Sequence, residues 1–259
     1  MHILKTHSLS IGYTNKTVAS DIDIALEAGD IIALIGPNGA GKSTLFKTLS
    51  GHIKPVSGTI EINGENAENV TAKERAKMMS VVLTERPDDM FLTVHEIVAS
   101  GRFPYSSMFG KLSENDEKII KESLEIIRIN HLNNKLFNTL SDGERQKVMI
   151  AKSIAQDTPI IFLDEPTAFL DYPSKIELFS ILKRLATEQK KTIIFSSHDI
   201  ELLLRYTDRL WIMGEQLPFI EGSCSELLNN GKIQKYFNLQ DTDNEYLTNK
   251  IQSIHPSGF

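Results

Sequence analysis

The chain has 259 residues, of which 41% are hydrophobic and 24% are charged. This balance is ordinary for a soluble globular protein and allows one large α/β domain or two small ones. The formal net charge of −6 argues against broad nucleic-acid binding, which needs a clustered basic surface. We therefore expect no nucleic-acid partner. The single cysteine, Cys224, cannot form an internal disulfide, so the fold does not depend on an oxidising compartment.

No segment approaches the roughly 18 to 20 consecutive apolar residues that a bilayer-spanning helix needs. The strongest apolar run near the start, residues 31–35, has the length of a strand. The N-terminus lacks the charged-then-apolar layout of a signal peptide. We therefore expect a cytoplasmic protein that reaches a membrane only by docking onto a partner.

The first part of the chain is predicted to be rich in strands. Residues 1–35 alternate apolar and polar side chains around turn formers, which is typical of half-buried strands. The run at 31–35 leads into a glycine-rich loop, and residues 43–49 read as a helix. Residues 57–64 predict another short strand, closed by an Asn-Gly turn.

From about Leu92 to Asp157 the periodicity becomes helical. Ser113 to Asp116 match a capping box, and apolar residues follow at helical spacing. The β/α rhythm then returns, because residues 160–163 and 193–196 are short apolar runs of the kind buried in parallel sheets. A helical segment, 174–189, lies between them.

These patterns predict one α/β domain over residues 1–240. A mostly helical subdomain is expected at about 85–155. Residues 241–259 form a polar C-terminal tail that we expect to be partly loose.

The sharpest local feature is a glycine-rich loop that fits the G-x-x-x-x-G-K-[ST] pattern of a P-loop. Glycines let successive backbone N–H groups point at phosphate oxygens, and the following helix offers its positive end to the same anion. Lys42 adds a charge at the β- and γ-phosphates, and the Ser43 hydroxyl is placed to ligate Mg²⁺. The predicted phosphate-binding residues are Gly36, Pro37, Asn38, Gly39, Ala40, Gly41, Lys42, Ser43 and Thr44. The loop alone predicts nucleoside triphosphate binding and leaves open which nucleotide is bound.

An acidic pair, Asp164-Glu165, follows the buried run at 160–163. Ligand sites in open α/β sheets lie at the carboxyl ends of the strands. Asp164 is therefore placed to hold Mg²⁺ through water, and Glu165 to polarise the attacking water as a general base. The alternative is that the two acids before Pro166 simply begin a turn.

Residues 140–146 read Leu-Ser-Asp-Gly-Glu-Arg-Gln. Ser141 and Glu144 form a capping box that opens a helix, which is a sufficient structural explanation. The same helix end, with Ser141 and Gly143 presented to solvent, is also suited to binding phosphate. Since one P-loop already serves this chain's nucleotide, a second anion site suggests a nucleotide bound between two subunits. Both interpretations can hold together.

Taken in order, these motifs resemble those of ABC (ATP-binding cassette) transporter ATPases. GPNGAGKST resembles the Walker A motif, LSDGERQ the ABC signature and IIFLDEP the Walker B motif. Residues 168–171 resemble the D-loop, and residues 197–199 contain the switch histidine, His198. Tyr13 falls where the family places an aromatic residue that stacks on adenine.

The resemblance implies a fold and a reaction. The expected fold is an α/β P-loop NTPase of the ABC type, with a RecA-like mixed sheet core, an N-terminal antiparallel β part and a helical subdomain. ATP and Mg²⁺ are the implied cofactors. Lys42, Glu165 and His198 are the implied catalytic residues, with His198 at the γ-phosphate.

The sequence departs from the family pattern at two places. The family usually has a glutamine that senses Mg²⁺ after the P-loop helix region, whereas this chain reads Thr84-Glu85 there. One of these two must replace it, and we assign Glu85 as the metal contact. Asp142 stands where the signature has its first glycine, and we expect its carboxylate to point outward, away from phosphate.

Residues 93–98, 101–105 and 109–113 resemble ATPases of iron-siderophore, haem and cobalamin importers. The ABC resemblance, together with the second anion site, implies a homodimer of ATPase subunits, peripheral at the cytoplasmic face of the inner (cell) membrane. The implied partners are polytopic membrane permease subunits, onto which the helical insertion docks. A periplasmic or lipoprotein substrate-binding protein acts indirectly. The alternatives are a soluble, non-transport ABC ATPase such as an iron–sulfur assembly subunit, and an exporter subunit. The cargo itself is left open.

Overall fold

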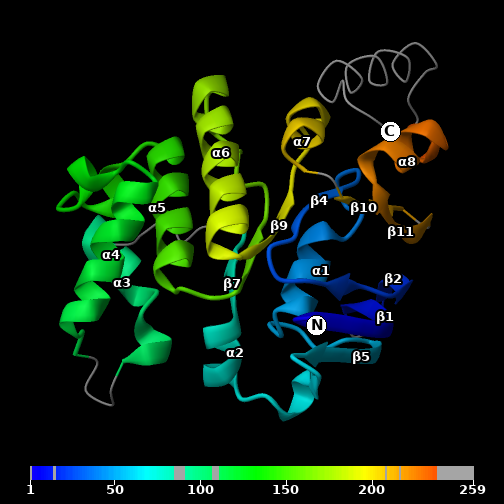
Figure 1. The fold of residues 1–259 in the computed structure, drawn as a ribbon, viewed down its shortest axis with the longest axis horizontal. Helices are drawn as coiled ribbons and strands as arrows, with labels where there is room; N and C mark the ends of the chain where they lie inside the picture. Colours follow the sequence, from blue (N-terminus) through cyan, green and yellow to red (C-terminus); the bar gives the residue numbers. More distant parts are fainter. Residues whose placement is uncertain are drawn as a thin grey trace. The chain divides into compact units, whose positions relative to one another are not determined.

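The computed structural model describes residues 2–13, 16–84, 91–106, 111–207, 209–215 and 217–237. The chain divides into two compact units (Figure 1). Unit 1 comprises Met1–Asn69 and Ile194–Phe259, and unit 2 comprises Val70–Ile193. The predicted tail at 241–259 lies outside the described residues.

Unit 1 contains an antiparallel sheet built around β1 (Leu4–Tyr13). β1 pairs with β2 (Lys16–Ile22), with the short β3 (Ala25–Leu26) and with β5 (Ser57–Ile62). β5 in turn pairs with β6 (Glu65–Asn66). The turn between β5 and β6 is Asn63-Gly64, with φ values of 52° and 83°. Both residues are therefore left-handed, which is the conformation that an Asn-Gly hairpin turn requires, and the predicted strand and turn are confirmed.

A second group of strands in unit 1 positions the P-loop. β10 (Arg209–Gly214) lies parallel to β4 (Ile31–Ile35) and antiparallel to β11 (Leu217–Ser223). β4 is almost wholly buried, as expected for a strand inside a parallel sheet. The described residues of this unit form α1 (Lys42–Leu49), the 3-10 turn Ala67–Asn69, α7 (Ile200–Tyr206), α8 (Cys224–Asn229) and α9 (Lys232–Phe237). The predicted strand–loop–helix unit is therefore β4, the P-loop and α1.

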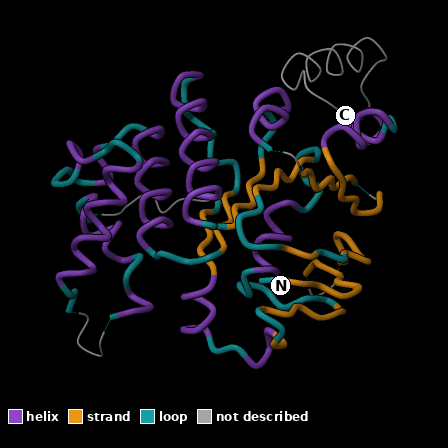
Figure 2. Tube along the Cα trace, in the orientation of Figure 1, coloured by secondary structure: helices purple, strands orange, loops and turns teal. Residues whose placement is uncertain are grey.

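Unit 2 is mainly helical, as Figure 2 shows by colour. Its parallel strands β7 (Met79–Val82) and β8 (Ile160–Leu163) pair directly. The helices in its described part are α2 (Ala72–Met78), α3 (Val94–Ser100), α4 (Glu114–Ile126), α5 (Asp142–Ala155) and α6 (Tyr172–Gln189), with 3-10 turns at Phe103–Tyr105, Asn130–Leu132 and Phe137–Thr139. β9 (Thr192–Ser196) carries the chain from unit 2 into unit 1.

Four helices of the described part of unit 2 begin at capping boxes. In each, the N-cap hydroxyl accepts a hydrogen bond from the N3 amide, and the N3 carboxylate accepts one from the N-cap amide. The pairs are Thr71 with Glu74, Thr93 with Glu96, Ser113 with Asp116, and Ser141 with Glu144. The boxes predicted at Ser113 and Ser141 are thereby confirmed.

The predicted α/β class, with an antiparallel N-terminal sheet, mixed parallel and antiparallel strands and a helical part, is confirmed. Among the described residues, no helix is both long enough and apolar enough to cross a membrane.

Candidate nucleotide-binding and catalytic site

The P-loop follows β4 directly and turns through two left-handed glycines. Gly39 has φ 84° and Gly41 has φ 102°, a region that side-chain-bearing residues rarely adopt. A Cβ at Gly41 would lie 2.3 Å from Cγ1 of Val18 on β2, so only glycine fits there. A Cβ at Gly39 would meet nothing within 4 Å. The loop is therefore packed at Gly41 and open at Gly39, where an incoming phosphate can approach the backbone.

Lys42 begins α1 and is held against the loop that precedes it. Its side chain is buried, and Nζ donates to the carbonyl oxygens of Gly36 (2.8 Å) and Pro37 (3.2 Å). The N-cap of α1 is Gly41, which has no side chain to cap the helix, and the first turn contains no acid. The positive end of α1 and the Lys42 ammonium are thus aimed at the concave side of one loop, an arrangement suited to an anion.

Two further predicted residues belong to unit 1. Tyr13 is the last residue of β1, opposite Lys16 of β2, and its side chain is 54% exposed. An exposed ring at a strand end can take a stacked base on its face. His198 lies between β9 and α7 and is also exposed.

The acidic pair of unit 2 emerges at the carboxyl end of β8, as predicted. Asp164 is 2% exposed, and its amide donates to the carbonyl of Val82 on β7 (2.8 Å). Glu165 has φ 50°, an uncommon left-handed conformation for a residue with a side chain. Such strain persists only where the surrounding structure imposes it, and it gathers at functional sites. The Thr84 hydroxyl lies 3.5 Å from the carbonyl oxygen of Asp164, whereas Glu85 falls outside the described residues.

The signature segment begins α5. The Glu144 carboxylate accepts hydrogen bonds from the Ser141 hydroxyl (2.7 Å) and amide (2.9 Å), and these bonds lower the pKa of Glu144. A Cβ at Gly143 would lie 3.0 Å from the carbonyl oxygen of Phe169. The absence of a side chain at Gly143 therefore allows the start of α5 to approach the D-loop closely.

Asp142, the departure inside the signature, has a largely exposed side chain, and its orientation relative to a bound phosphate stays a prediction. Its Oδ1 lies 3.9 Å from Nη1 of Arg145, one turn along α5. Arg145 is itself anchored, because its Nη2 donates to the carbonyl of Asn138 (2.8 Å). The extra carboxylate therefore faces a fixed cation on its own helix.

The D-loop follows Glu165 in unit 2. Phe169 has φ 65° and a 63% exposed side chain. Asp171 is the N-cap of α6, where its Oδ1 accepts from the Ser174 amide (3.1 Å). Hydrogen bonds from Ser174 lower the pKa of Asp171. The D-loop is thus fixed at its end by a helix cap while it presents an aromatic ring to solvent.

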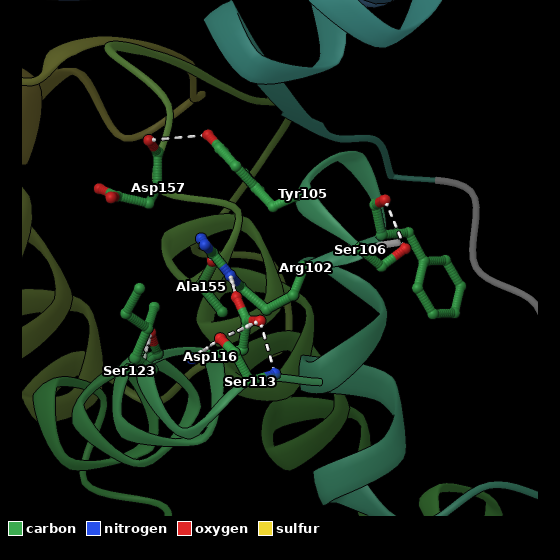
Figure 3. A network of polar contacts seen from close by, with 10 residues as sticks. Arg102, Tyr105, Ser106, Ser113, Asp116, Ser123, Ala155 and Asp157 are labelled. Atoms are coloured by element: carbon green, nitrogen blue, oxygen red, sulfur yellow. Dashed lines mark hydrogen bonds and ion pairs between the residues drawn. The ribbon is translucent and has the colours of Figure 1, made fainter. Parts of the chain in front are cut away.

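The segment 101–105, which resembles the iron-chelate group, is built around a buried ion pair (Figure 3). Arg102 Nε donates to Asp116 Oδ1 (2.8 Å), and Nη1 donates to the Ala155 carbonyl (2.9 Å). Both charged side chains are at least nine-tenths buried. Arg102 also lies over the Tyr105 ring, 4.1 Å from its centroid, so one guanidinium joins the end of α3, the start of α4 and the end of α5.

Two hollows were not foreseen from the sequence. In unit 1, a cavity of about 500 Å³ lies beside the P-loop, between β2 and the β10–β11 hairpin. In unit 2, a groove of about 420 Å³ lies between α3, α4 and the 3-10 turn at Asn130–Leu132. Both are formed by residues far apart in the sequence, so no local motif predicts them.

The fold and these motifs define a P-loop ATPase. More particularly, the chain belongs to the ABC transporter family, whose model matches residues 19–168. It is an ABC transporter ATP-binding protein, an ATPase whose hydrolysis of ATP is coupled to transport.

Curated relatives match nearly the whole chain. An uncharacterised ABC transporter ATP-binding protein of Methanocaldococcus jannaschii is 41% identical over 93% of this chain and 83% of the relative. The iron(3+)-hydroxamate import ATP-binding protein FhuC of Bacillus subtilis is 35% identical over 92% of this chain and 89% of its own length. The ferric enterobactin transport ATP-binding protein FepC of Escherichia coli is 33% identical, with coverages of 92% and 88%.

Solved structures have the same fold. A chain of a transporter assigned to the metal-chelate type, in an inward-facing conformation, superposes with a TM-score of 0.80 at 28% identity, covering 92% of this chain and 90% of that one. CbiO1 of Clostridium perfringens, part of the transporter complex CbiONQ, gives 0.75 at 28% identity, with coverages of 96% and 99%.

Proposed function

We propose that this protein is the ATPase subunit of an importer for iron chelates (siderophores), haem or cobalamin. Siderophores are the first choice within that group. The observation that carries this choice is that relatives named for ferric-siderophore import, including FhuC and FepC, match over nine-tenths of the chain at 33–35% identity. The subunit would work as a peripheral protein at the cytoplasmic face of the inner membrane.

Phosphate binding is assigned to the P-loop of unit 1. Its open backbone at Gly39, the uncapped start of α1 and the Lys42 ammonium supply three sources of positive potential for a triphosphate. Tyr13 stacks on the adenine. His198 contacts the γ-phosphate, where a donor stabilises charge that develops as the phosphoryl group leaves.

Magnesium binding is assigned to hydroxyl and carboxylate oxygens, the donors that this hard cation prefers. Ser43, in the first turn of α1, and the buried Asp164 fit this chemistry, and Glu85 is proposed as a further contact. When bound, Mg²⁺ supplies positive charge at the β- and γ-phosphates. Glu165 acts as the general base that takes a proton from the attacking water.

The signature helix is assigned to the nucleotide of a second copy. Two subunits bind two ATP molecules head to tail, each between Lys42 of one copy and Ser141 and Gly143 of the other. ATP favours the closed dimer because it binds that state more tightly, and hydrolysis removes the ligand that holds it closed.

The groove in unit 2 is assigned to the membrane permease. Its floor is apolar, from Ile120 and Leu124, and its rim is polar, with His95 Nε2 3.0 Å from Glu117 Oε2. An apolar floor with a polar rim is the usual composition of a protein-binding groove. Closure of the ATPase dimer would thus be transmitted to the pore, while a substrate-binding protein outside the membrane selects the cargo.

Uptake measurements test this function. A strain that lacks the gene should lose accumulation of one labelled cargo among ferric siderophores, haem and cobalamin, and the wild-type gene should restore it. The Glu165→Gln variant should not restore it, although it is made at the same level. Unchanged uptake of all three cargoes in the deletion strain would overturn the assignment.

The alternative function is that of a soluble, non-transport ATPase such as an iron–sulfur assembly subunit. Co-purification from detergent extracts separates the two. A polytopic membrane partner supports the importer, whereas a soluble scaffold partner would replace it with the alternative.

A further inference from the structure

The cavity beside the P-loop has walls from three parts of unit 1. The edge strand β2 lines it from Lys16 to Ser20, and so do Gly39 and Ala40 of the P-loop. The β10–β11 hairpin contributes Glu215, Leu217 and Pro218 to the lining. β2 and β11 lie side by side (Figure 1). A volume of about 500 Å³ is within the usual range for small-molecule sites.

The position of this cavity relates it to the nucleotide. Gly39 and Ala40, which line it, belong to the P-loop, where phosphates are expected. Lys16, which also lines it, pairs across the strands with Tyr13, the proposed adenine-stacking residue. A nucleotide that spans from the P-loop to Tyr13 has its sugar between these two points. The ribose is therefore the part of ATP that lies between the P-loop and Lys16, two of the parts that line the cavity.

We propose that Glu215 selects the sugar of the nucleotide by accepting a hydrogen bond from a ribose hydroxyl. Glu215 is an exposed residue directly after β10. Its side chain makes no ion pair or hydrogen bond with the other residues that the structure describes. A carboxylate can only accept, and it is repelled by the triphosphate. The uncharged donors that ATP presents in this region are the ribose hydroxyls, which a carboxylate binds well.

The hairpin that carries Glu215 packs against α9. Gly214 pairs with Leu217 across the hairpin, and a Cβ at Gly214 would lie 2.8 Å from Leu217 Cδ1 and 2.9 Å from Tyr236 Cδ1. The Tyr236 hydroxyl on α9 donates to the carbonyl of Pro218. Because Gly214 is held by packing and Pro218 by this hydrogen bond, the two strand ends beside Glu215 are held in place, as a selective contact requires.

The assignment rests on the proposed nucleotide site and is tested by comparing ATP with 2′-deoxy-ATP and 3′-deoxy-ATP. Equilibrium dissociation constants are measured by isothermal titration calorimetry for the whole chain and for Glu215→Ala. The wild type should bind ATP about tenfold more tightly than at least one deoxynucleotide, the usual effect of a hydrogen bond to a charged group. In Glu215→Ala, this ratio should fall to about one, because only ATP binding weakens.

Glu68 provides the matched control, since it is an exposed acid of the same unit and is not part of the cavity wall. Glu68→Ala should keep the wild-type ratio. The proposal is overturned if the wild type binds all three nucleotides equally, or if Glu215→Ala keeps the wild-type ratio. If the proposed nucleotide site itself is wrong, the result is different, because the wild type would then bind none of the three nucleotides.

Discussion

The backbone of Gly143, at the start of α5, lies against the carbonyl of Phe169 in the D-loop. A Cβ at Gly143 would be 3.0 Å from that oxygen, closer than nine in ten real Cβ contacts. Two segments that the sequence suggested as separate motifs are therefore packed together inside unit 2. A displacement of one should move the other.

This contact predicts the effect of Gly143→Ala. Alanine favours a helix over glycine by about 1 kcal/mol, so propensity alone predicts a more stable protein. The contact with a backbone oxygen opposes this gain, because overpacking costs about 1–3 kcal/mol. We expect a net loss of stability of about 1 kcal/mol in urea unfolding, together with lower ATPase activity. A variant more stable than the wild type would show that the D-loop can move away from the new methyl group with no loss of stability.

A second prediction concerns the extra charge in the signature. Asp142→Asn keeps the size of the side chain and removes its charge. An acid in the first turn of a helix stabilises that helix but opposes a second anion at the same end. The comparison is made in the Glu165→Gln background, which is expected to retain bound ATP. Asp142→Asn combined with Glu165→Gln should form the ATP-dependent dimer about two- to fivefold more tightly than Glu165→Gln alone, measured by sedimentation at low salt. An unchanged association constant would mean that Arg145 already neutralises Asp142 fully.

Local signals explain which features the sequence could predict. The P-loop at Gly36 to Thr44 and the capping box at Ser113 depend on residues within one short segment, so their spacing is enough. Arg102 and Asp116 are 14 residues apart, and their pairing depends on how α3, α4 and α5 pack. Glu215 is a single acid after a strand, so the sequence does not predict a role for it. The proposed role depends on the packing of the hairpin beside β2 and the P-loop.

The third prediction tests the proposed general base. Glu165→Gln keeps the size of the side chain and removes its ability to accept a proton at neutral pH. Hydrolysis should fall at least about 100-fold, the lower range for losing general-base catalysis, while the affinity for ATP is retained. Steady-state phosphate release and calorimetric titration measure the two effects separately. If hydrolysis continues at the wild-type rate, the general base is another group.

The last prediction follows from the Arg102–Asp116 pair. Hydrogen bonds from the Ser113 hydroxyl and amide, together with Arg102, lower the pKa of Asp116 from 3.8 to about 2. Because the pKa is lower in the folded chain, the carboxylate stabilises the fold fully above its unfolded pKa. This stabilisation is lost as the pH falls from about 4 to 2, and it amounts to about 2 kcal/mol.

Asp116→Asn isolates this contribution, because every other acid still titrates in the variant. The difference in unfolding free energy between wild type and variant should be constant from about pH 5 to 8 and should shrink by about 2 kcal/mol between pH 4 and 2. Asp157→Asn is the control: Asp157 Oδ1 lies 2.6 Å from Lys191 Nζ, but its side chain is 55% exposed. An exposed pair contributes less than about 1 kcal/mol, so this variant should track the wild type closely at every pH. Equal pH dependence in the two variants would mean that burial adds nothing to the Arg102–Asp116 pair.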